Sequence, residues 1–357
     1  MGVPNEPVRI GIIGSGGIAG AHAERYRNLP QARVVAVADV VPGKAQSFID
    51  RFGFEGARAF TDLGEMLRDD FDAVSICTFN AAHYEPTMQA LSAGKHVLLE
   101  KPMAVNLQEG VDMVRLSRRV GKMLSIGFQT RYDPGVMTAR RIVASGALGR
   151  IYYAETGGGR RKGIPGGTFV RRASAIGGAI LDIGCYSLDT ALHVMGNPRP
   201  ISASAHTSAH FGTSPTYARQ AWGGNMSPSD FDVEDFGAAF IRLEGDAILY
   251  FKIAWAMHAE TLGSTFLLGT EGGLNMDGMR VYHDQFGTGV HTDVPVRGGN
   301  WRDSFTRKIE AFVEAVQTGG PAPIPGEDIL NATAILDAIY RSAAEHAEVR
   351  IDIPALD

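Results

Sequence analysis

The sequence contains little cysteine. Among its 357 residues only Cys77 and Cys185 are cysteines, and neither belongs to a CxxC pair. A disulfide framework or a cysteine-rich metal site needs several suitably spaced thiols, so this composition argues against both. We expect the two cysteines to be reduced and buried.

Long apolar runs are also missing. No stretch approaches eighteen consecutive apolar residues, and the N-terminal MGVPNEPVRIGIIG has no basic segment before its apolar run. Gly2 is compatible with N-myristoylation, but Glu6 stands where that modification requires Ser or Thr. These features predict a cytoplasmic protein with neither a membrane span nor a lipid anchor.

The sequence also has no excess of positive charge. The chain has 34 Lys and Arg against 39 Asp and Glu, which gives a formal net charge of -5. Nucleic-acid-binding proteins concentrate Lys and Arg on one face, so we expect a small-molecule ligand and no nucleic-acid partner. The length and the 45% hydrophobic content predict two domains, each with its own core.

Buried strands and amphipathic helices alternate in the first third of the chain. The apolar runs that predict strands are 8–13, 34–38, 73–77, 97–99 and 123–126. Segments with apolar residues three to four apart, which predict helices, are 19–28, 42–52, 83–92 and 107–120. Such an alternation predicts an α/β domain with a doubly wound parallel sheet over residues 1–130.

The pattern changes near Ile151. We expect a long Gly- and Arg-rich loop there, then a helix over 183–195, and then strands over 236–243, 247–254, 264–268 and 280–283. Residues 131–357 therefore predict an α+β domain with a large, mostly antiparallel sheet. Helices are expected over 302–317 and 327–347, where they have the option of packing back against the first domain, and a closing strand over 349–353.

A glycine loop follows the first predicted strand. In Gly14-x-Gly16-x-x-Ala19 the turn lies between a strand and a helix, whose exposed N–H groups and positive dipole end suit a pyrophosphate. A glycine turn that only packs the helix on the sheet would leave Asp39, at the end of the next strand, unexplained. Asp39 can accept hydrogen bonds from ribose hydroxyls and repel a 2′-phosphate, which favours NAD over NADP. The predicted contacts of this loop with NAD are Gly14, Ser15, Gly16, Gly17, Ile18 and Asp39.

Lys101 and a later helix carry further polar groups. Lys101 lies at the end of a predicted parallel strand, and parallel sheets bind ligands at this end of their strands. Pro102 predicts a fixed turn, whose peptide bond is either cis or trans. The alternative interpretation of Lys101 is an ordinary surface lysine. Polar residues spaced four, three and four apart share one face of a helix. In the segment that begins at Gly177 these residues are Asp182, Tyr186, Asp189 and His193. Their shared face is compatible either with a functional site or with a solvent-exposed surface.

Together these segments resemble the Gfo/Idh/MocA oxidoreductase family over essentially the whole chain. The resemblance rests on the glycine loop with Asp39, on Ser75 to Asn80 followed by His83, on Glu100-Lys101-Pro102, and on Gly177 to Asp189. It implies an NAD-dependent sugar or polyol dehydrogenase that assembles as a homodimer or homotetramer through its large sheet. It also implies a Rossmann domain followed by that sheet domain.

The resemblance also implies roles for individual residues. Lys101 would contact the nicotinamide ribose and a substrate hydroxyl, Asp182 would orient substrate, and Tyr186 would be the acid-base residue where many members have His. A lysine within about 4–6 Å would lower a tyrosine pKa by roughly 1–3 units, which makes Lys101 the candidate activator. Further predicted cofactor contacts are Thr78, Asn80, His83, Glu100, Lys101 and Gln129, and the predicted substrate contacts are Lys101, Arg131, Asp182, Tyr186 and Asp189.

The substrate class stays open at this point. A glycoside or anhydrosugar oxidised at its 3-hydroxyl is one interpretation, with aldose 1-dehydrogenase and inositol dehydrogenase as alternatives. Two other classes remain, an NAD-retaining glycosidase and a non-catalytic NAD sensor. The basic segment 160–172 is expected to be a solvated loop, His206 and His210 are not expected to bind metal, and Trp222, Trp255 and Trp301 are expected in the core or at an interface.

Overall fold

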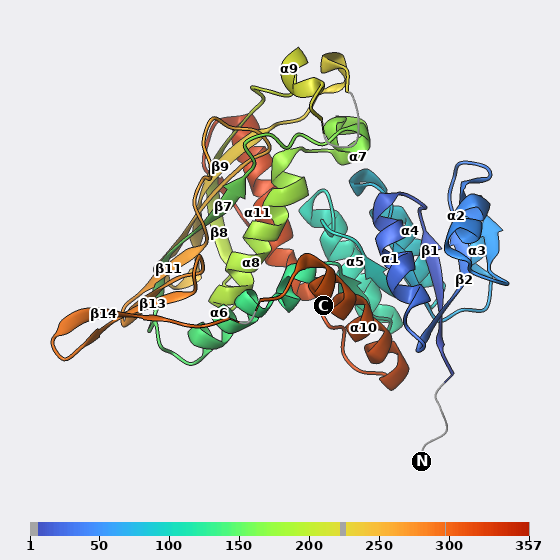
Figure 1. The fold of residues 1–357 in the computed structure, drawn as a ribbon, viewed down its shortest axis with the longest axis horizontal. Helices are drawn as coiled ribbons and strands as arrows, with labels where there is room; N and C mark the ends of the chain where they lie inside the picture. Colours follow the sequence, from blue (N-terminus) through green and yellow to red (C-terminus); the bar gives the residue numbers. More distant parts are fainter. Residues whose placement is uncertain (1–5, 222–225, 297, 357) are drawn as a thin grey trace. The chain divides into compact units, whose positions relative to one another are not determined.

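The computed structural model describes residues 6–221, 226–296 and 298–356. The chain divides into two compact units, which we describe separately (Figure 1). Unit 1 comprises residues 1–129, 302–329 and 355–357, and unit 2 comprises residues 130–301 and 330–354. The N-terminal boundary lies near the expected residue 130, but unit 1 also takes 302–329 from the region that the sequence assigned to the second domain.

Unit 1 contains a six-stranded parallel sheet in the order β3-β2-β1-β4-β5-β6. Its strands are β1 (Val8–Ile13), β2 (Ala32–Ala38), β3 (Arg58–Phe60), β4 (Ala73–Ile76), β5 (His96–Leu99) and β6 (Leu124–Ile126). The chain order reverses between β1 and β4, and doubly wound sheets bind ligands at that switch point, outside the carboxyl ends of the strands. The predicted parallel sheet is confirmed.

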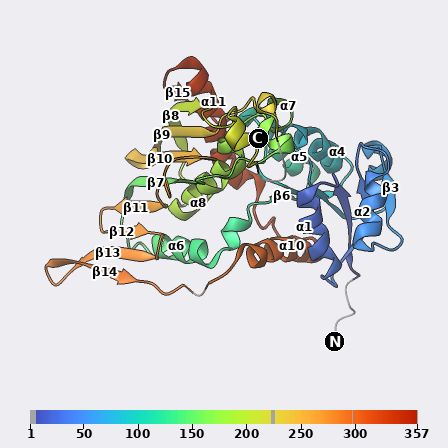
Figure 2. The same cartoon turned by 45° about the horizontal axis from the view of Figure 1, so that its top comes forward.

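Helices cover both faces of this sheet (Figure 2). They are α1 (Gly17–Arg27), α2 (Lys44–Phe52), α3 (Leu63–Leu67), α4 (Tyr84–Ser92), α5 (Leu107–Val120) and α10 (Trp301–Thr318). Capping fixes several boundaries: the side chains of Asp62 and Asn106 accept hydrogen bonds from the backbone N–H of Glu65 and Glu109, and α5 ends at Gly121 in the left-handed conformation.

Helix α10 returns to unit 1 although it follows unit 2 in the sequence. Its apolar residues Phe305, Ile309, Phe312 and Val313 are buried in the same core as α1, α2, β1 and β2. Their spacing of four, three and one places them on one face of the helix, which is the pattern that predicted it. The core of the N-terminal domain is thus completed by residues from the last sixth of the chain.

Unit 2 contains a nine-stranded sheet in the order β14-β13-β12-β11-β7-β10-β9-β8-β15, which Figure 2 shows along its length. Neighbouring strands are antiparallel except for β7 and β10, so the expected mostly antiparallel sheet is confirmed. The strands are β7 (Ile151–Gly159), β8 (Pro200–Ser208), β9 (Phe236–Leu243), β10 (Ala247–Ala254), β11 (Phe266–Gly269), β12 (Gly272–Asn275), β13 (Arg280–Gln285), β14 (Thr288–Asp293) and β15 (Val349–Arg350).

The expected loop after Ile151 is wrong, because Ile151–Gly159 is the central strand β7. Ala154 and Thr156 alternate toward the core, as in any half-buried strand. A Cβ on Gly157 would lie 1.9 Å from the carbonyl oxygen of Lys252 on β10. The glycines that suggested a loop therefore permit close strand packing. The closing strand is also shorter than expected, since β15 ends at Arg350.

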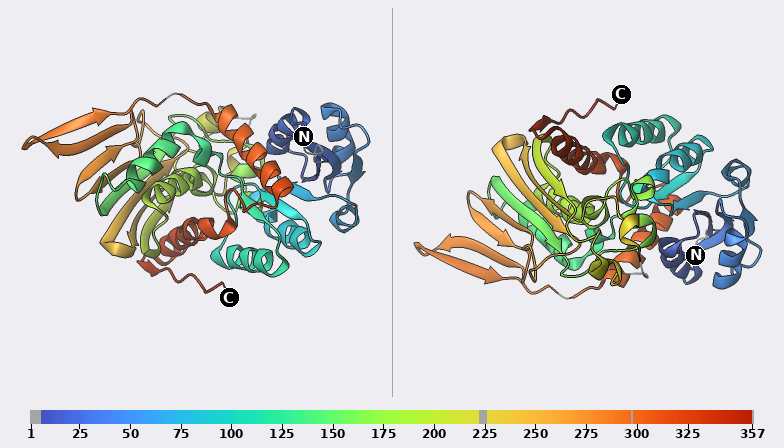
Figure 3. Two further views of the ribbon diagram at one scale, coloured as in Figure 1. Left: turned by 90° about the horizontal axis from the view of Figure 1, so that it is seen from below. Right: turned by 90° about the horizontal axis from the view of Figure 1, so that it is seen from above.

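Helices pack on one face of the large sheet (Figure 3). They are α6 (Pro134–Ala144), α8 (Cys185–Met195) and most of α11 (Gly326–Glu345), and two short helices are α7 (Arg172–Ala175) and α9 (Pro215–Ala218). On the other face the paired strands place Tyr153, Phe240, Tyr250, Phe266, Leu268 and Tyr282 beside one another; we call this set the open face. Among them Phe240, Leu268 and Tyr282 are more than one-third exposed.

The segment Arg172–Met195 is long and apolar enough, by length and composition alone, to cross a membrane. In the fold 72% of its most apolar window is buried. Leu181, Leu188 and Leu192 lie in the core of unit 2, so the apolar character of this segment is accounted for by packing.

Both cysteines are buried, as the sequence predicted, and neither forms a disulfide bond. Cys77 follows β4 in unit 1, and Cys185 begins α8 in unit 2. Burial raises the pKa of the Cys77 thiol well above its ordinary value. A neutral, buried thiol of this kind is chemically inert, which fits a packing role.

Candidate functional site

The predicted cofactor residues of unit 1 gather at one edge of its sheet. Each lies just beyond the carboxyl end of a strand, and five neighbouring strands contribute one position each: Gly14, Asp39, Thr78, Lys101 and Gln129. Because all strands are parallel, these positions share an edge. The folding of unit 1 therefore brings together residues that are up to 115 positions apart in the sequence.

The glycine loop fits a dinucleotide. Gly14 has φ +87°, and a Cβ there would lie 2.9 Å from the carbonyl oxygen of Cys77. Gly16 and Gly17 have no atom within 4 Å of the position of an added Cβ, so space stays open at the start of α1. No side chain caps α1 at Gly16. A helix N-terminus with this open approach suits a pyrophosphate.

Asp39 lies beside the glycine loop. Its carboxylate accepts hydrogen bonds from the backbone N–H of Ser15 (3.0 Å) and of Val41 (3.0 Å), and also from the Ser15 hydroxyl. Burial alone would raise the pKa of Asp39, but the hydrogen bonds from Ser15 and Val41 outweigh it and hold the pKa below its ordinary value. Asp39 is therefore an ionised acceptor held at the loop.

We expect Asp39→Ala to raise the Kd for NADH about tenfold or more and to reduce the preference for NAD over NADP, because hydrogen bonds to a charged group contribute about 1.5–3 kcal/mol. Titration of NADH and NADPH fluorescence measures both. Asp50→Ala, at an exposed position of α2, is the matched control and should leave both affinities unchanged. Equal affinities for Asp39→Ala and the wild type would refute the assignment.

A buried charged cluster lies behind this edge; we call His22, Glu100 and Lys308 the buried cluster. His22 Nε2 lies 2.8 Å from Glu100 Oε1, and the Lys308 ammonium donates to the same oxygen. His22 Nδ1 lies 3.1 Å from the Ser75 hydroxyl. All three side chains of the cluster are almost completely buried. The cluster links α1, the end of β5 and α10.

The charges of the buried cluster follow from its burial. Desolvation lowers the pKa of His22 to about 4, so this imidazole is neutral at pH 7. Burial also lowers the pKa of Lys308. For Glu100, burial alone would raise the pKa, but the charge of Lys308 and the hydrogen bond from His22 hold it well below its ordinary value. Glu100 and Lys308 therefore form a buried ion pair.

The pKa of His22 predicts acid sensitivity. Its folded pKa of about 4 lies below the ordinary 6.5, so between these values the unfolded chain binds a proton that the folded chain does not. We expect the free energy of unfolding to be constant above about pH 6.5 with respect to His22 and to fall by up to about 3 kcal/mol as the pH drops to about 4. Urea unfolding at several pH values measures this, and a pH dependence unchanged in His22→Gln would contradict it.

The chain around Lys101 is held on both sides. The Lys101-Pro102 peptide bond is cis, as the sequence allowed. The backbone N–H of Lys101 lies 3.4 Å from Glu100 Oε2, and His83 Nδ1 donates to the carbonyl of Pro102 (2.8 Å). Burial lowers the pKa of His83, which is 1% exposed. His83, predicted to touch the cofactor, thus fixes the backbone that carries Lys101.

The remaining predicted residues of unit 1 lie in the same region. The Thr78 hydroxyl donates to the carbonyl of Ala82 (2.7 Å), which closes the turn that begins at Asn80. Gln129 is 2% exposed and starts the turn after β6. A Cβ on Gly127 would lie 2.9 Å from Glu100 Oε1, so this glycine makes room for the Glu100 carboxylate.

In unit 2, Asp182 lies in a π-helical turn. This turn spans Ile180–Gly184 and continues into α8, where the sequence predicted one regular helix from residue 183. Trp255 is completely buried and donates from Nε1 to Asp182 Oδ2 (3.0 Å). Single π turns within helices are rare and frequent at functional sites. The wider turn changes the angular spacing between Asp182 and Tyr186 from that of an α-helix.

The other polar residues of α8 differ in their surroundings. Asp189 is 1% exposed and accepts two hydrogen bonds from Arg131, from Nε (3.0 Å) and Nη2 (2.7 Å). The two predicted substrate contacts Arg131 and Asp189 are therefore bonded to each other. Burial and the nearby Arg131 charge lower the pKa of His193 to about 4. The face predicted from spacing is thus a partly buried, charged surface of the helix.

The remaining candidates from the sequence have ordinary environments. In the basic segment Arg161 pairs with Glu260 and Arg171 with Asp230, all at exposed positions. Trp255 lies in the core, Trp301 is 51% exposed, and Trp222 lies outside the described residues. Among the residues that the structure describes, no group of three His, Cys, Asp or Glu side chains is arranged to hold a metal ion.

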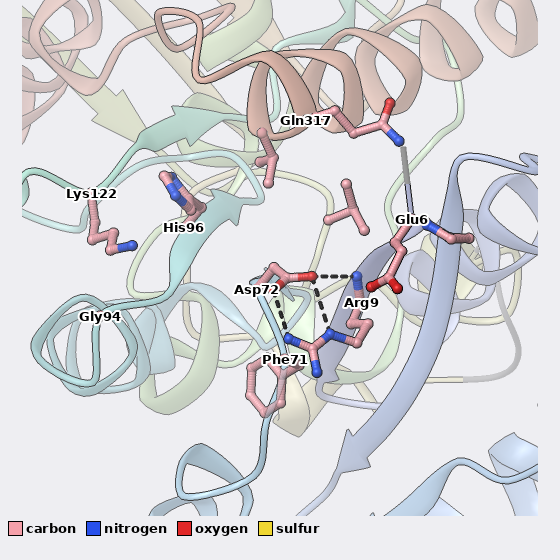
Figure 4. A pocket seen from close by; sticks show the side chains of 11 residues that line it. Glu6, Arg9, Phe71, Asp72, Gly94, His96, Lys122 and Gln317 are labelled. Carbon is pink, nitrogen blue, oxygen red and sulfur yellow. Dashed lines mark hydrogen bonds and ion pairs between the residues drawn. The ribbon is translucent and has the colours of Figure 1, made fainter. Parts of the chain in front are cut away.

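A polar hollow of about 480 Å³ lies in unit 1 at the opposite edge of the sheet (Figure 4). It is lined at the amino ends of the strands by Arg9, Asp72, His96 and Lys122, and Arg9 and Asp72 are bonded to each other across it. Ligands of doubly wound sheets bind at the carboxyl ends, so this hollow is not the dinucleotide site.

Comparison with known families identifies both domains. Residues 8–128 match the oxidoreductase family with an NAD-binding Rossmann fold, and residues 136–275 match the Gfo/Idh/MocA C-terminal domain. D-Glucoside 3-dehydrogenase from Escherichia coli (strain K12) is 30% identical over 353 residues, which cover 97% of this chain and 98% of that protein. Inositol 2-dehydrogenase from Rhizobium meliloti (strain 1021) is 26% identical over 351 residues, which cover 96% and 99%.

Solved structures share the fold. Levoglucosan dehydrogenase in complex with NADH and levoglucosan has a TM-score of 0.80 and 23% identity, with 97% of this chain and 100% of that chain covered. GenD2 from gentamicin A biosynthesis in complex with NAD has a TM-score of 0.75 and 26% identity, with 97% of both chains covered.

Proposed function

Because this chain belongs to the Gfo/Idh/MocA family of NAD-binding oxidoreductases that act on CH–OH groups, we propose that it oxidises a secondary alcohol of a sugar, glycoside or anhydrosugar. The 3-hydroxyl of a glucoside is the proposed position. The observation that carries it is the full-length similarity to D-glucoside 3-dehydrogenase, at 30% identity. The carboxyl edge of unit 1, with an open glycine loop and the ionised Asp39, supports NAD as the cofactor.

We propose that Lys101, Asp182 and Tyr186 are the catalytic residues. Lys101 would hold the reacting hydroxyl and, through its charge, favour the ionised form of Tyr186. Asp182, held by Trp255, would orient the sugar through a second hydroxyl. Tyr186 would take the hydroxyl proton as the carbon is oxidised to a ketone. Bound NAD⁺ supplies the hydride acceptor.

The surrounding residues serve this reaction indirectly. The buried pair of Arg131 and Asp189 would hold the turn after β6 against α8 and so keep Tyr186 in place. Gln129, Thr78 and Asn80 would line the cofactor, as the family resemblance implies. Arg131 and Asp189 remain predicted substrate contacts.

A substrate panel tests the proposal. The purified protein is incubated with NAD⁺ and methyl glucoside, glucose, levoglucosan, myo-inositol or xylose, and NADH absorbance is followed; the glucoside is expected to give the highest kcat/KM. Product analysis for a 3-keto sugar fixes the carbon. Faster oxidation of myo-inositol, or of an aldose at C1, than of the glucoside would contradict the proposed substrate. If no polyol is oxidised, the proposed function is wrong.

We propose that the open face of the large sheet joins copies of this chain into a homodimer or homotetramer. Its exposed Phe240, Leu268 and Tyr282 form an apolar surface of the kind that marks protein contacts. We expect Leu268→Arg to shift the protein toward monomers in sedimentation velocity, whereas Val40→Arg, at an exposed position of unit 1, should not. Monomeric wild-type protein would refute this assembly. The cytoplasmic location expected from the sequence stays a prediction.

A further inference from the structure

Glu234 is a buried carboxylate in unit 2 that lies just before β9. It accepts hydrogen bonds from the backbone N–H of Gly178 (2.8 Å) and of Ile180 (3.1 Å) through one oxygen, Oε1. Its own carbonyl oxygen accepts from the N–H of Ala179 (3.1 Å). Three successive N–H groups at the start of the π-helical turn are therefore satisfied by one residue that lies 54 or more positions away in the sequence.

Tyr340 on α11 completes this arrangement. Its hydroxyl donates to the same Glu234 oxygen (2.9 Å). Burial raises the pKa of Glu234 and raises the pKa of Tyr340 well above its ordinary value, so the phenol stays a donor at neutral pH. Glu234 therefore accepts a hydrogen bond from α11 and also accepts hydrogen bonds from the segment that leads into α8.

Gly177 and Gly178 are required by this contact. A Cβ on Gly178 would lie 1.9 Å from the Glu234 carbonyl oxygen, and a Cβ on Gly177 would lie 2.0 Å from the Tyr340 hydroxyl oxygen. Both distances are far below any van der Waals contact. The two glycines let the backbone approach closely enough for Glu234 to cap the turn.

The residue next to Glu234 reaches the same turn from another side. The carbonyl of Asp235 accepts from the backbone N–H of Trp255 (2.8 Å), and the indole of Trp255 holds the Asp182 carboxylate. The Asp235 carboxylate accepts from three backbone N–H groups at 210–212. Glu234 therefore holds the backbone that leads to Asp182, and the neighbouring Asp235 holds Trp255, whose side chain is bonded to Asp182.

We propose that Glu234 is a positioning residue for the proton-handling side chains Asp182 and Tyr186. By capping the π-helical turn from residue 178 it sets the rotation and height at which these two side chains leave the helix. This inference rests on the proposed function, because it assigns Glu234 a role in that reaction. A shift of about 1 Å in a reacting group can lower a rate about 10²-fold, so the cap has a kinetic consequence.

The test compares Glu234→Ala with Glu234→Gln. The alanine variant is expected to lower kcat on the best sugar about 10–100-fold, while the glutamine variant, which keeps an acceptor oxygen, should stay within about threefold of the wild type. The Kd for NADH should stay within about twofold in both, because the dinucleotide residues belong to unit 1. Glu348→Ala, at an exposed acid of unit 2, is the matched control.

A second measurement does not depend on turnover. Hydrogen exchange of peptides covering 172–186 should accelerate in Glu234→Ala and not in Glu348→Ala. Unchanged kcat and unchanged exchange in Glu234→Ala would overturn the inference, and so would a fall in kcat accompanied by an equal loss of NADH affinity, which indicates general unfolding. If the wild type oxidises no sugar, the proposed function fails, and the exchange result alone decides whether Glu234 holds the turn.

Discussion

Tyr186→Phe is expected to lower kcat for sugar oxidation by about 10²–10⁴-fold, because a positioned acid-base group contributes about that factor. The substitution removes only the phenolic oxygen, so packing of the first turn of α8 is kept. The Kd for NADH should not change, because the predicted cofactor residues belong to unit 1. Stopped-flow measurement of NADH formation under saturating sugar separates the chemical step from product release.

Tyr152→Phe is the control for this prediction. It removes the same oxygen from a tyrosine on β7 that is 43% exposed, and it should leave kcat unchanged. A Tyr186→Phe variant that keeps more than about half of the wild-type kcat would exclude Tyr186 as the proton carrier.

Lys308→Met is expected to lower the free energy of unfolding by about 3–5 kcal/mol, because removing one partner of a buried ion pair leaves the other charge uncompensated. Glu100 would then keep its negative charge without Lys308, or take up a proton at the expense of its hydrogen bonds. Methionine has a similar length and no charge, so cavity formation contributes little. Urea unfolding followed by circular dichroism measures the change.

The double variant Glu100→Gln with Lys308→Met separates charge from packing. With both charges removed, most of the lost stability should return, as expected when a buried ion pair is replaced by neutral groups. Lys44→Met, on the surface of α2, should change stability by less than about 0.5 kcal/mol. A loss below about 1 kcal/mol for Lys308→Met would mean that water reaches the buried cluster.

The main strands and helices of residues 1–129 could be predicted from the sequence with bounds close to those observed. Apolar runs that are buried on both faces, such as Val8–Ile13, have no alternative to a central strand, and Leu107–Val120 has a cap residue at each end. Among the missed elements the short ones carry little periodicity, whereas the nine-residue strand β7 was expected to be a loop because of its glycines. Strand β3 has three residues, and β12 and β14 lie in glycine-rich or mostly exposed sequence.

The positions of the candidate residues could be predicted from the sequence where they are tied to strand ends, and could not where they are tied to tertiary contacts. The end of each parallel strand marks one edge, so Asp39 and Lys101 could be found from local patterns. Lys308 and Glu234 could not, because each looks like an ordinary charged residue and gains its role only from partners more than fifty positions away. The available sign of burial in the sequence was the helical spacing, which places Lys308 on the same face as the apolar residues Phe305, Ile309 and Phe312.

The π-helical turn was also beyond sequence reasoning. No residue of Ile180–Gly184 marks a π turn, and regular spacing predicted that Asp182 and Tyr186 lie one helical turn apart. The contacts at this turn are tertiary: Glu234 accepts from the N–H of Ile180, and Trp255 donates to Asp182. The nearby Gly177-Gly178 pair permits the close approach of the Glu234 carbonyl and the Tyr340 hydroxyl.

The return of α10 to unit 1 has a consequence for biosynthesis. Phe305, Ile309 and Phe312 complete the core around β1 and α1, and Lys308 neutralises a carboxylate beside them. These residues leave the ribosome only after the whole of 130–301 has emerged. The dinucleotide-binding domain therefore lacks α10 while the other domain is synthesised. Until then the apolar side chains of β1 and α1 lack the packing partners that α10 supplies, and a protein truncated before residue 301 would lack them throughout.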